Sequence, residues 1–419
     1  MLHTSRVSAA VLAALLALFP AACANMQHLA PPPQDEVADV QEDAAPELSS
    51  AAMATAVRDA DGAAATYTTA EEAIGAGDAA GLLTLLAAMP YEERENDTFA
   101  NSYLALDRAA ARDFAGARAY LGLTGDPETE ADLPGFYLWL DAWLIALEGN
   151  GDAAIERHRD VAGSMPGITA DLSLAALLEA AGRTDEALAV YDALTPSVIE
   201  APEHEFDPRS IVFHHVSTVI VRHALLLQRL GRIDEAKAVY AQLAEAEPEQ
   251  ATSYAAAIES LETGKNLDNE PLTFLTGFSQ SLSDVGSALQ QQRYITAALS
   301  GRDLDGLDTE RAGFDLITLV VDPSNEAVRS GLVDALYEQA LYEGAAHVAM
   351  AAPETTPALQ ISAAQALIMS DQEAEARAAI SKALDLSSED QKLDTLYGAL
   401  QLSALLNDRE KAMTLLPEL

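Results

Sequence analysis

GRTDEALAVYDAL at residues 182–194 returns nearly unchanged as GRIDEAKAVYAQL at residues 231–243. Each copy opens with a glycine that can end a preceding helix. An acidic pair then follows at the start of a second helix, where the helix dipole favours negative charge. Alanine, valine, tyrosine and leucine recur at helical spacing after the acidic pair. Each copy therefore predicts two helices joined by a tight turn at Gly182 or Gly231.

A longer pattern surrounds the second copy. It combines small residues where two antiparallel helices cross, large residues that fill the crossing, a glycine that ends the first helix and a proline that stops the second. These residues are Ala224 and Ala236, Leu227 and Tyr240, Gly231, and Pro248. The pattern resembles the tetratricopeptide repeat, a helix–turn–helix unit of about 34 residues.

Weaker copies extend the resemblance over most of the chain. Earlier turns fall at residues 77, 112 and 149, later units are marked by Tyr337, Gly344, Ala376 and Ala412, and residues 195–210 form an insertion. Because a single unit cannot bury its apolar face, the resemblance implies a right-handed all-α solenoid. We place an N-terminal array at 51–260 and a degenerate C-terminal array at 261–419, with the register of 251–321 left open. Glycine and proline interrupt any heptads, which argues against a coiled coil.

Composition excludes one class of partner. The chain has 66 acidic and 24 basic residues and a formal net charge of −42. Such a charge repels phosphate backbones, so nucleic acid is not expected as a partner. Aromatic residues make up 5% of the chain, and alanine is abundant, which favours closely packed helices over a β-sandwich.

The first 22 residues are typical of a secretory signal peptide. Residues 7–19 form an apolar run too short to span a bilayer, and no longer run follows. Cys23, the only cysteine, resembles the acylated cysteine of a bacterial lipobox, with Ala21 and Ala22 at the small positions and Pro20 where leucine is usual. Cleavage after Ala24 at an ordinary A-x-A site is the alternative.

Residues 23–50 follow as an acidic, proline-rich segment without Lys or Arg. Such a composition predicts a disordered tether. An acylated Cys23 and this tether would hold a folded body at a membrane surface, and the resemblance to lipoproteins with alanine after the cysteine implies the outer membrane.

Aromatic residues mark the candidate binding groove. In tetratricopeptide-repeat proteins the first helix of each unit lines a concave surface that binds peptides or helices. The resemblance carries this role to Tyr67, Phe99, Phe136, Trp139 and Trp143, the last three at i, i+3 and i+7 on one helix face. The alternative is that this stripe only packs against a neighbouring helix.

Chemical motifs give no support for catalysis. GRDLDGLDTE at residues 301–310 lacks the glycine position and the final glutamate of an EF-hand loop, so a turn before a helix explains it better than calcium. His204, His214 and His215 have no metal-site spacing. We therefore expect no metal and no cofactor.

The sequence thus predicts a non-catalytic scaffold, tethered in the bacterial cell envelope, that binds periplasmic or outer-membrane proteins or peptides through a repeat groove. A role in envelope assembly or secretion is implied. Two alternatives stay open: a periplasmic enzyme or ligand-binding protein with a site at 260–320, and a self-associating structural element.

Overall fold

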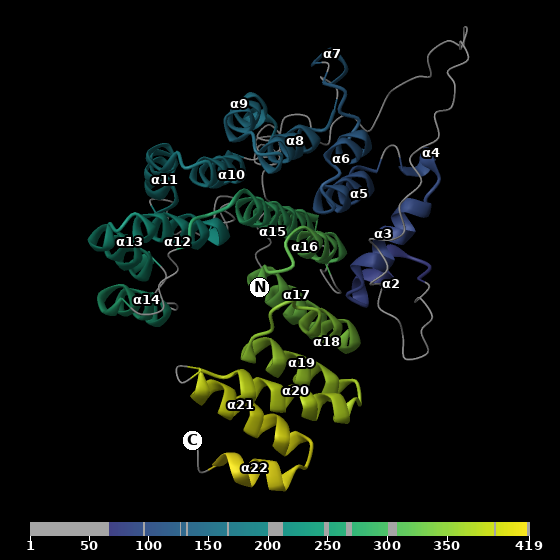
Figure 1. The fold of residues 1–419 in the computed structure, drawn as a ribbon, viewed down its shortest axis with the longest axis vertical. Coiled ribbons are helices and arrows are strands. Elements are labelled where there is room, and N and C mark those ends of the chain that lie inside the picture. Colours follow the sequence, from purple (N-terminus) through teal and green to yellow (C-terminus); the bar gives the residue numbers. More distant parts are fainter. Residues whose placement is uncertain are drawn as a thin grey trace, which may run out of the picture.

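The computed structural model describes residues 67–94, 97–125, 127–130, 133–165, 167–199, 213–246, 251–264, 270–300, 308–388 and 391–416. Within these ranges the chain is built from helices joined by short turns, and they contain no strand (Figure 1). The signal peptide 1–22 and the tether 23–50, with Cys23, lie outside the described residues.

Helical hairpins follow one another along an arc in the first part of the fold (Figure 1). In chain order its helices are α2 (Ala70–Gly75), α3 (Ala79–Ala88), α4 (Tyr91–Arg94), α5 (Thr98–Ala110), α6 (Phe114–Tyr120), α7 (Pro127–Glu130), α8 (Gly135–Leu147), α9 (Gly151–Val161), the short 3₁₀ helix η1 (Ala162–Ser164), α10 (Gly167–Ala180), α11 (Thr184–Ile199), α12 (Phe213–Arg229), α13 (Ile233–Ala246) and α14 (Ala251–Thr263).

Two helices that follow α14 in the chain lie inside this arc (Figure 1). They are the long α15 (Phe274–Ser300) and α16 (Thr309–Val321). A second row of hairpins then continues to the C-terminal end: α17 (Glu326–Glu338), α18 (Tyr342–Met350), α19 (Pro357–Met369), α20 (Glu373–Leu386), α21 (Lys392–Leu405) and α22 (Arg409–Leu415). We call α17–α22 the C-terminal hairpins.

The turns confirm the repeat positions read from the sequence. Left-handed backbone ends the first helix of each N-terminal hairpin, because only that conformation returns the chain tightly for the second helix. The φ values are +67° at Gly77, 64° at Arg112, +93° at Gly149, +75° at Gly182 and +73° at Gly231. Ala340, Asp371 and Asn407 take the same conformation in the C-terminal hairpins.

An aspartate or asparagine caps the second helix directly after several of these turns. The Asp78 carboxylate accepts a hydrogen bond from the Gly81 amide at 2.9 Å, and Asp408 accepts one from the Lys411 amide at 3.1 Å. Asp113 and Asn150 do the same for α6 and α9. A turn residue followed by a cap therefore fixes where each second helix begins.

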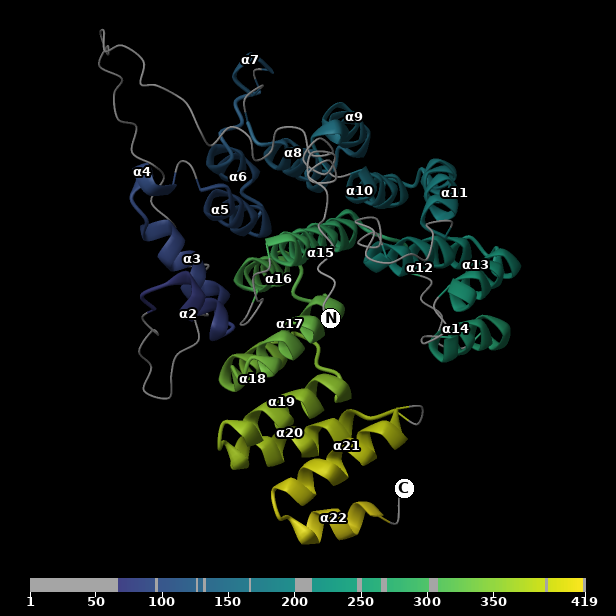
Figure 2. The same ribbon diagram turned by 180° about the vertical axis from the view of Figure 1, so that it is seen from behind.

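Consecutive hairpins pack side by side and make an all-α solenoid, which confirms the predicted fold class. Figures 1 and 2 both show α15 and α16 inside the arc of the N-terminal hairpins, where they pack on α10, α8 and α5. The division at residue 260 stays a prediction. Gly344 on α18 lies so close to the first hairpin that an added Cβ would collide with the Gly75 carbonyl oxygen.

Candidate functional site

The concave face of the N-terminal hairpins is the surface that the sequence assigns to a partner. Phe99 on α5 and Phe136 on α8 occupy equivalent positions, because each lies thirteen residues before a left-handed turn residue, Arg112 or Gly149. Trp139 and Trp143 follow Phe136 on the same side of α8. These side chains do point into the arc, and there they meet α15 and α16.

Seven aromatic rings form a continuous cluster across this contact, which we call the groove cluster: Phe99, Tyr103, Phe136, Trp139, Trp143, Phe278 and Phe314. Phe278 of α15 stacks on Trp143 at 5.4 Å and lies 6.2 Å from Trp139. Phe314 of α16 lies 5.8 Å from Phe136 and 6.4 Å from Phe99. The chain's own helices therefore fill this part of the groove.

Burial shows how complete the filling is. Trp139, Trp143 and Phe278 are each 0% exposed, and Phe314 is 1% exposed. Gly277 allows α15 to approach, since a Cβ there would lie 3.2 Å from Trp143. A partner can touch the tryptophans only after α15 has moved away, so in this conformation the stripe packs internally.

A buried serine ties both tryptophans to α10. The Ser173 hydroxyl accepts hydrogen bonds from the Trp139 and Trp143 Nε1–H groups at 2.9 and 3.0 Å, and lies 3.1 Å from His158 Nε2. With both lone pairs engaged, the hydroxyl has only its proton left for His158, so Nε2 accepts and the imidazole is neutral. Burial lowers the pKa of His158 to about 4.

Polar contacts also hold α15 to α12 and to Asn325 at the start of α17. Arg222 of α12 holds Asp284 of α15 through two hydrogen bonds, 2.6 and 2.9 Å long, and Asp284 is 5% exposed. Asn325 donates to the Ser279 hydroxyl at 2.7 Å. Breaking one partner of such a buried pair costs about 3–5 kcal/mol, so these contacts oppose any displacement of α15.

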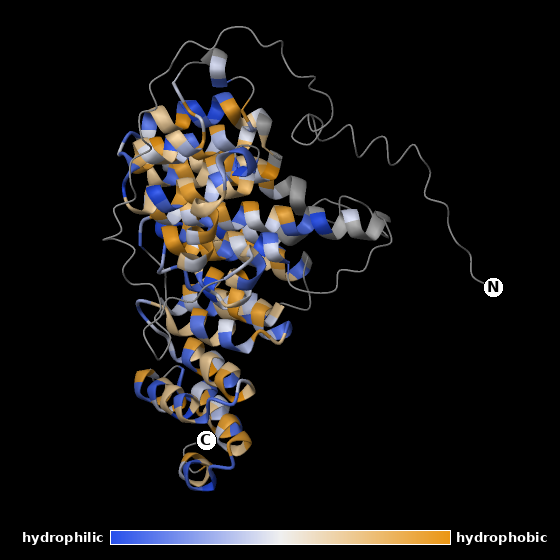
Figure 3. Ribbon diagram, turned by 90° about the vertical axis from the view of Figure 1, so that its right-hand side faces the viewer, coloured by the Kyte–Doolittle hydropathy of each residue, from blue (hydrophilic) through white to orange (hydrophobic). Residues whose placement is uncertain are grey.

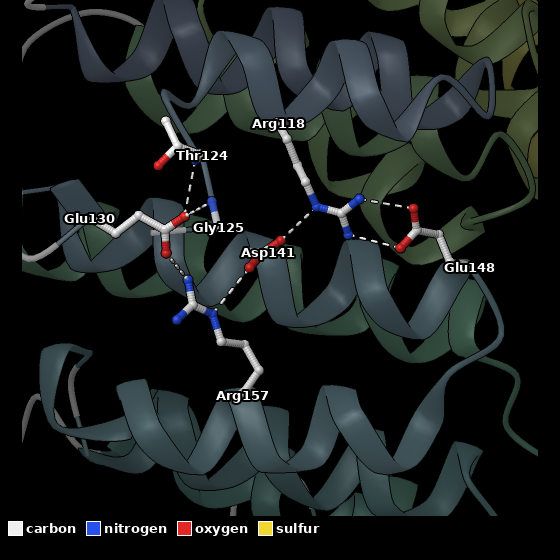
Figure 4. Close-up of polar contacts among 7 residues, drawn as sticks. All are labelled: Arg118, Thr124, Gly125, Glu130, Asp141, Glu148 and Arg157. Carbon is white, nitrogen blue, oxygen red and sulfur yellow. Dashed lines mark hydrogen bonds and ion pairs between the residues drawn. The ribbon is translucent and has the colours of Figure 1, made fainter. Parts of the chain in front are cut away.

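The opposite side of α8 carries an ionic network, drawn in Figure 4. Asp141 accepts from Arg118 Nε at 2.9 Å and from Arg157 Nε at 3.1 Å. Arg118 binds Glu148 through two hydrogen bonds of 2.8 Å, which lower the pKa of Glu148, and Arg157 binds Glu130 at 2.8 Å. The network joins α6, α7, α8 and α9, so it stabilises the array.

The remaining residues singled out from the sequence lie elsewhere or outside the description. Tyr67 is half-buried beside Asp78 and Gly81, and burial together with Asp78 raises its pKa to about 12. Asp308 caps α16 by accepting from the Arg311 amide at 3.1 Å, as a turn before a helix requires. The side chains of His204, His214 and His215 fall outside the described residues.

Three residues at this contact were not recognised from the sequence. Phe278, Phe314 and Ser173 were not singled out, because a helical period alone does not reveal which distant helix will pack where. The feature that distinguishes this region is the length of its helix: residues 274–300 form one long helix between two rows of short hairpins.

A shallow cleft of about 330 Å³ lies over α12, lined by Thr218, Val221, Arg222, Leu225 and Gln280. In the described ranges no group of three His, Cys, Asp or Glu side chains is placed to hold a metal ion. None of the described helices is both long and apolar enough to cross a membrane.

Exposed apolar side chains gather on the C-terminal hairpins. Eight of the ten large hydrophobic side chains that are exposed among the described residues lie between 350 and 416: Met350, Met369, Leu386, Leu393, Tyr397, Leu405, Met413 and Leu416. Figure 3 shows hydrophobic residues recurring along these hairpins down to the last helix. The other two, Tyr91 and Leu230, belong to the N-terminal hairpins.

The first helices of these hairpins present the same face that α8 turns to α15. Six residues before each left-handed turn, where α8 has Trp143, stand Asp334, Gln365 and Gln401, and all three are exposed. Met369 and Leu405 lie one helical turn beyond the two glutamines and are 48% and 65% exposed. We call these five side chains the open groove face.

The stacked hairpins with left-handed turns define the class, an α-solenoid of tetratricopeptide-like repeats. No protein-family model matches the chain, and no curated protein matches it. Among solved structures, it is similar to a tetratricopeptide repeat protein from Parabacteroides merdae ATCC 43184, with 14% identity and a TM-score of 0.23. The match covers 64% of this chain and 99% of that one.

Proposed function

We propose that the protein is a non-catalytic scaffold that binds other proteins through the open groove face of its C-terminal hairpins. The observation that carries this proposal is the exposure of Met369 and Leu405 beside Gln365 and Gln401. In the hairpins that pack on α15 and α16, the residues six before the turn are instead buried, namely Leu106, Trp143 and Ala176. Side-chain amides can bond to a peptide backbone while the apolar side chains bury a partner's own.

The chemistry of the face suggests the kind of segment that fits it. Asp334 and Glu338 place two carboxylates at the α17 end, whereas Met369 and Leu405 make the α19–α21 end apolar. Burial and the neighbouring Glu338 raise the pKa of Asp334. A polypeptide with a basic residue at one end and apolar residues at the other matches this gradient.

We also propose that Cys23 is acylated and anchors the scaffold in the bacterial envelope, through the tether at 23–50, with partners among periplasmic or outer-membrane proteins. The support is the sequence alone: an apolar signal followed by the only cysteine of the chain. Two or three acyl chains, at about 0.8 kcal/mol per buried methylene, would hold it stably. A role in envelope assembly or secretion belongs to the same proposal.

Photo-crosslinking in the native envelope tests both parts. A photoreactive amino acid at Gln365 or Gln401 is expected to form adducts with other proteins, whereas the same residue at Glu156, exposed on α9, is expected to form few. Met369→Glu with Leu405→Glu should abolish the adducts, and Met350→Glu, a matched change outside the face, should keep them.

The anchor is read out in the same cells. Cys23→Ser is expected to remove palmitate labelling and to move the protein into the soluble periplasmic fraction. Unchanged fractionation would contradict the anchor but not the scaffold, while equal adducts at Gln365 and Glu156 would contradict the open groove face but not the anchor.

A further inference from the structure

The last hairpin, α21–α22, exposes side chains at positions that the preceding hairpin covers. The left-handed turn residues Asp371 and Asn407 set the two hairpins in register, 36 residues apart. In this register Tyr397 corresponds to Ile361, and Leu416 corresponds to Ile380.

Both counterparts in the earlier hairpin are covered by helix packing. Ile361 lies against α21, where a Cβ added to Gly398 would be 3.1 Å from it, and Ile380 is 2% exposed. Tyr397 and Leu416 are 57% and 51% exposed. They therefore stand on the side of α21–α22 where a further hairpin would stack.

Two more side chains belong to this side. Met413 corresponds to Arg377, which bonds the following hairpin at Asp408 and at the Leu406 carbonyl. Met413 itself is 66% exposed, and Leu393, one turn before Tyr397, is 62% exposed. We call Leu393, Tyr397, Met413 and Leu416 the end face. Among the described residues no helix covers it.

The charge of this hairpin differs from that of the whole chain, and this difference bears on which partner can bind the end face. The chain carries a net charge of −42, so most faces of two copies repel each other. The described residues of α21–α22 are balanced, with Lys392, Arg409 and Lys411 against Asp394, Asp408 and Glu410. A hairpin without net charge adds no repulsion where it meets its own copy across a two-fold axis.

We propose that the end face binds a second copy of this chain and forms an end-to-end dimer. The two helices of this hairpin, of 14 and 7 residues, offer about 300 Å² per copy, from lengths of about 21 and about 10 Å and a helix diameter of about 10 Å. Stable interfaces bury about 800 Å² per partner. The dimer is therefore weak and forms reversibly as the concentration rises.

Sedimentation equilibrium of the full chain carrying Cys23→Ser tests this. We expect a reversible monomer–dimer equilibrium that Tyr397→Glu with Leu416→Glu weakens at least about 100-fold, whereas Met350→Glu, an equally exposed apolar residue on α18, leaves it within about 3-fold. Raising NaCl from about 50 to about 500 mM should tighten the dimer, because it screens the long-range repulsion.

Each other result overturns the proposal. A monomer at all concentrations up to about 500 µM removes the second copy as the occupant. A dimer that survives the double substitution uses another face. A monomeric chain whose end face captures a different protein in the envelope assigns the face to that protein. Partner adducts at Gln365 in a monomeric double variant leave the scaffold proposal intact, so the two proposals fail separately.

Discussion

Replacing Phe278 with alanine is expected to lower the free energy of unfolding by about 3–5 kcal/mol. The Phe278 side chain is fully buried and stacks on Trp143, with Trp139 beside it. Its removal would leave a cavity between α15 and α8 that neither helix can close, because Arg222 and Asp284 hold α15 in place. Urea unfolding followed by circular dichroism measures the loss.

Tyr91→Ala is the matched control, since Tyr91 is 66% exposed and its loss should change the free energy of unfolding by less than about 0.5 kcal/mol. The unfolding slope with urea should stay the same in both variants if the protein unfolds as one unit. A cost below about 1 kcal/mol for Phe278→Ala would mean that α15 is a peripheral helix.

Acidification is the second large effect. Burial lowers the pKa of His158 to about 4, whereas an unfolded histidine titrates near about 6.5. Between these values the unfolded chain binds the proton and the folded chain does not, so stability falls as the pH falls. The difference corresponds to at most about 3 kcal/mol, fully present above about pH 6.5 and lost progressively toward pH 4.

His158→Gln provides the comparison, because glutamine can still accept from the Ser173 hydroxyl but does not titrate. Urea unfolding at several pH values between 4.5 and 7 should show a steeper loss for the natural chain than for the variant. Parallel curves would mean that His158 takes up its proton at the same pH in the folded and the unfolded chain. Burial also lowers the pKa of His223 and of His347. Both residues are present in both chains, so their contributions to the pH dependence of stability cancel in the comparison.

The structure accounts for the parts of the fold that local sequence could predict. Gly182 and Gly231, and the weaker turns at 77, 112 and 149, were found because a left-handed turn and its cap depend on adjacent residues. The register of 251–321 could not be found, because α15 and α16 pack on helices far away in the sequence, and helical period does not encode that partner.

The candidate site shows the same division. Phe136, Trp139 and Trp143 were placed on one face of a helix, and that face does point into the arc. Their contact with a partner protein stays a prediction, because the occupant of the groove in this structure is the chain itself. Ser173 was missed since a serine in an alanine-rich helix gives no sign that two indoles will converge on it.

Because α15 and α16 fill the N-terminal groove, we expect a partner to bind the C-terminal hairpins instead. The concave face of the N-terminal hairpins packs against α15 and α16. In the C-terminal hairpins, by contrast, Gln365, Gln401, Met369 and Leu405 are exposed. In the described part of residues 260–320, the buried groups Asp284 and Ser279 bond within the protein, and a ligand site in that region stays a prediction.

Native-state hydrogen exchange of α15 tests most directly whether its helix is a permanent part of the core. We expect the slowest amides of residues 278–287 to exchange only through global unfolding, with the same free energy as those of residues 172–178 in α10. Exchange of α15 at a free energy lower by more than about 2 kcal/mol, insensitive to urea, would contradict it and make α15 a helix that opens to expose the tryptophans.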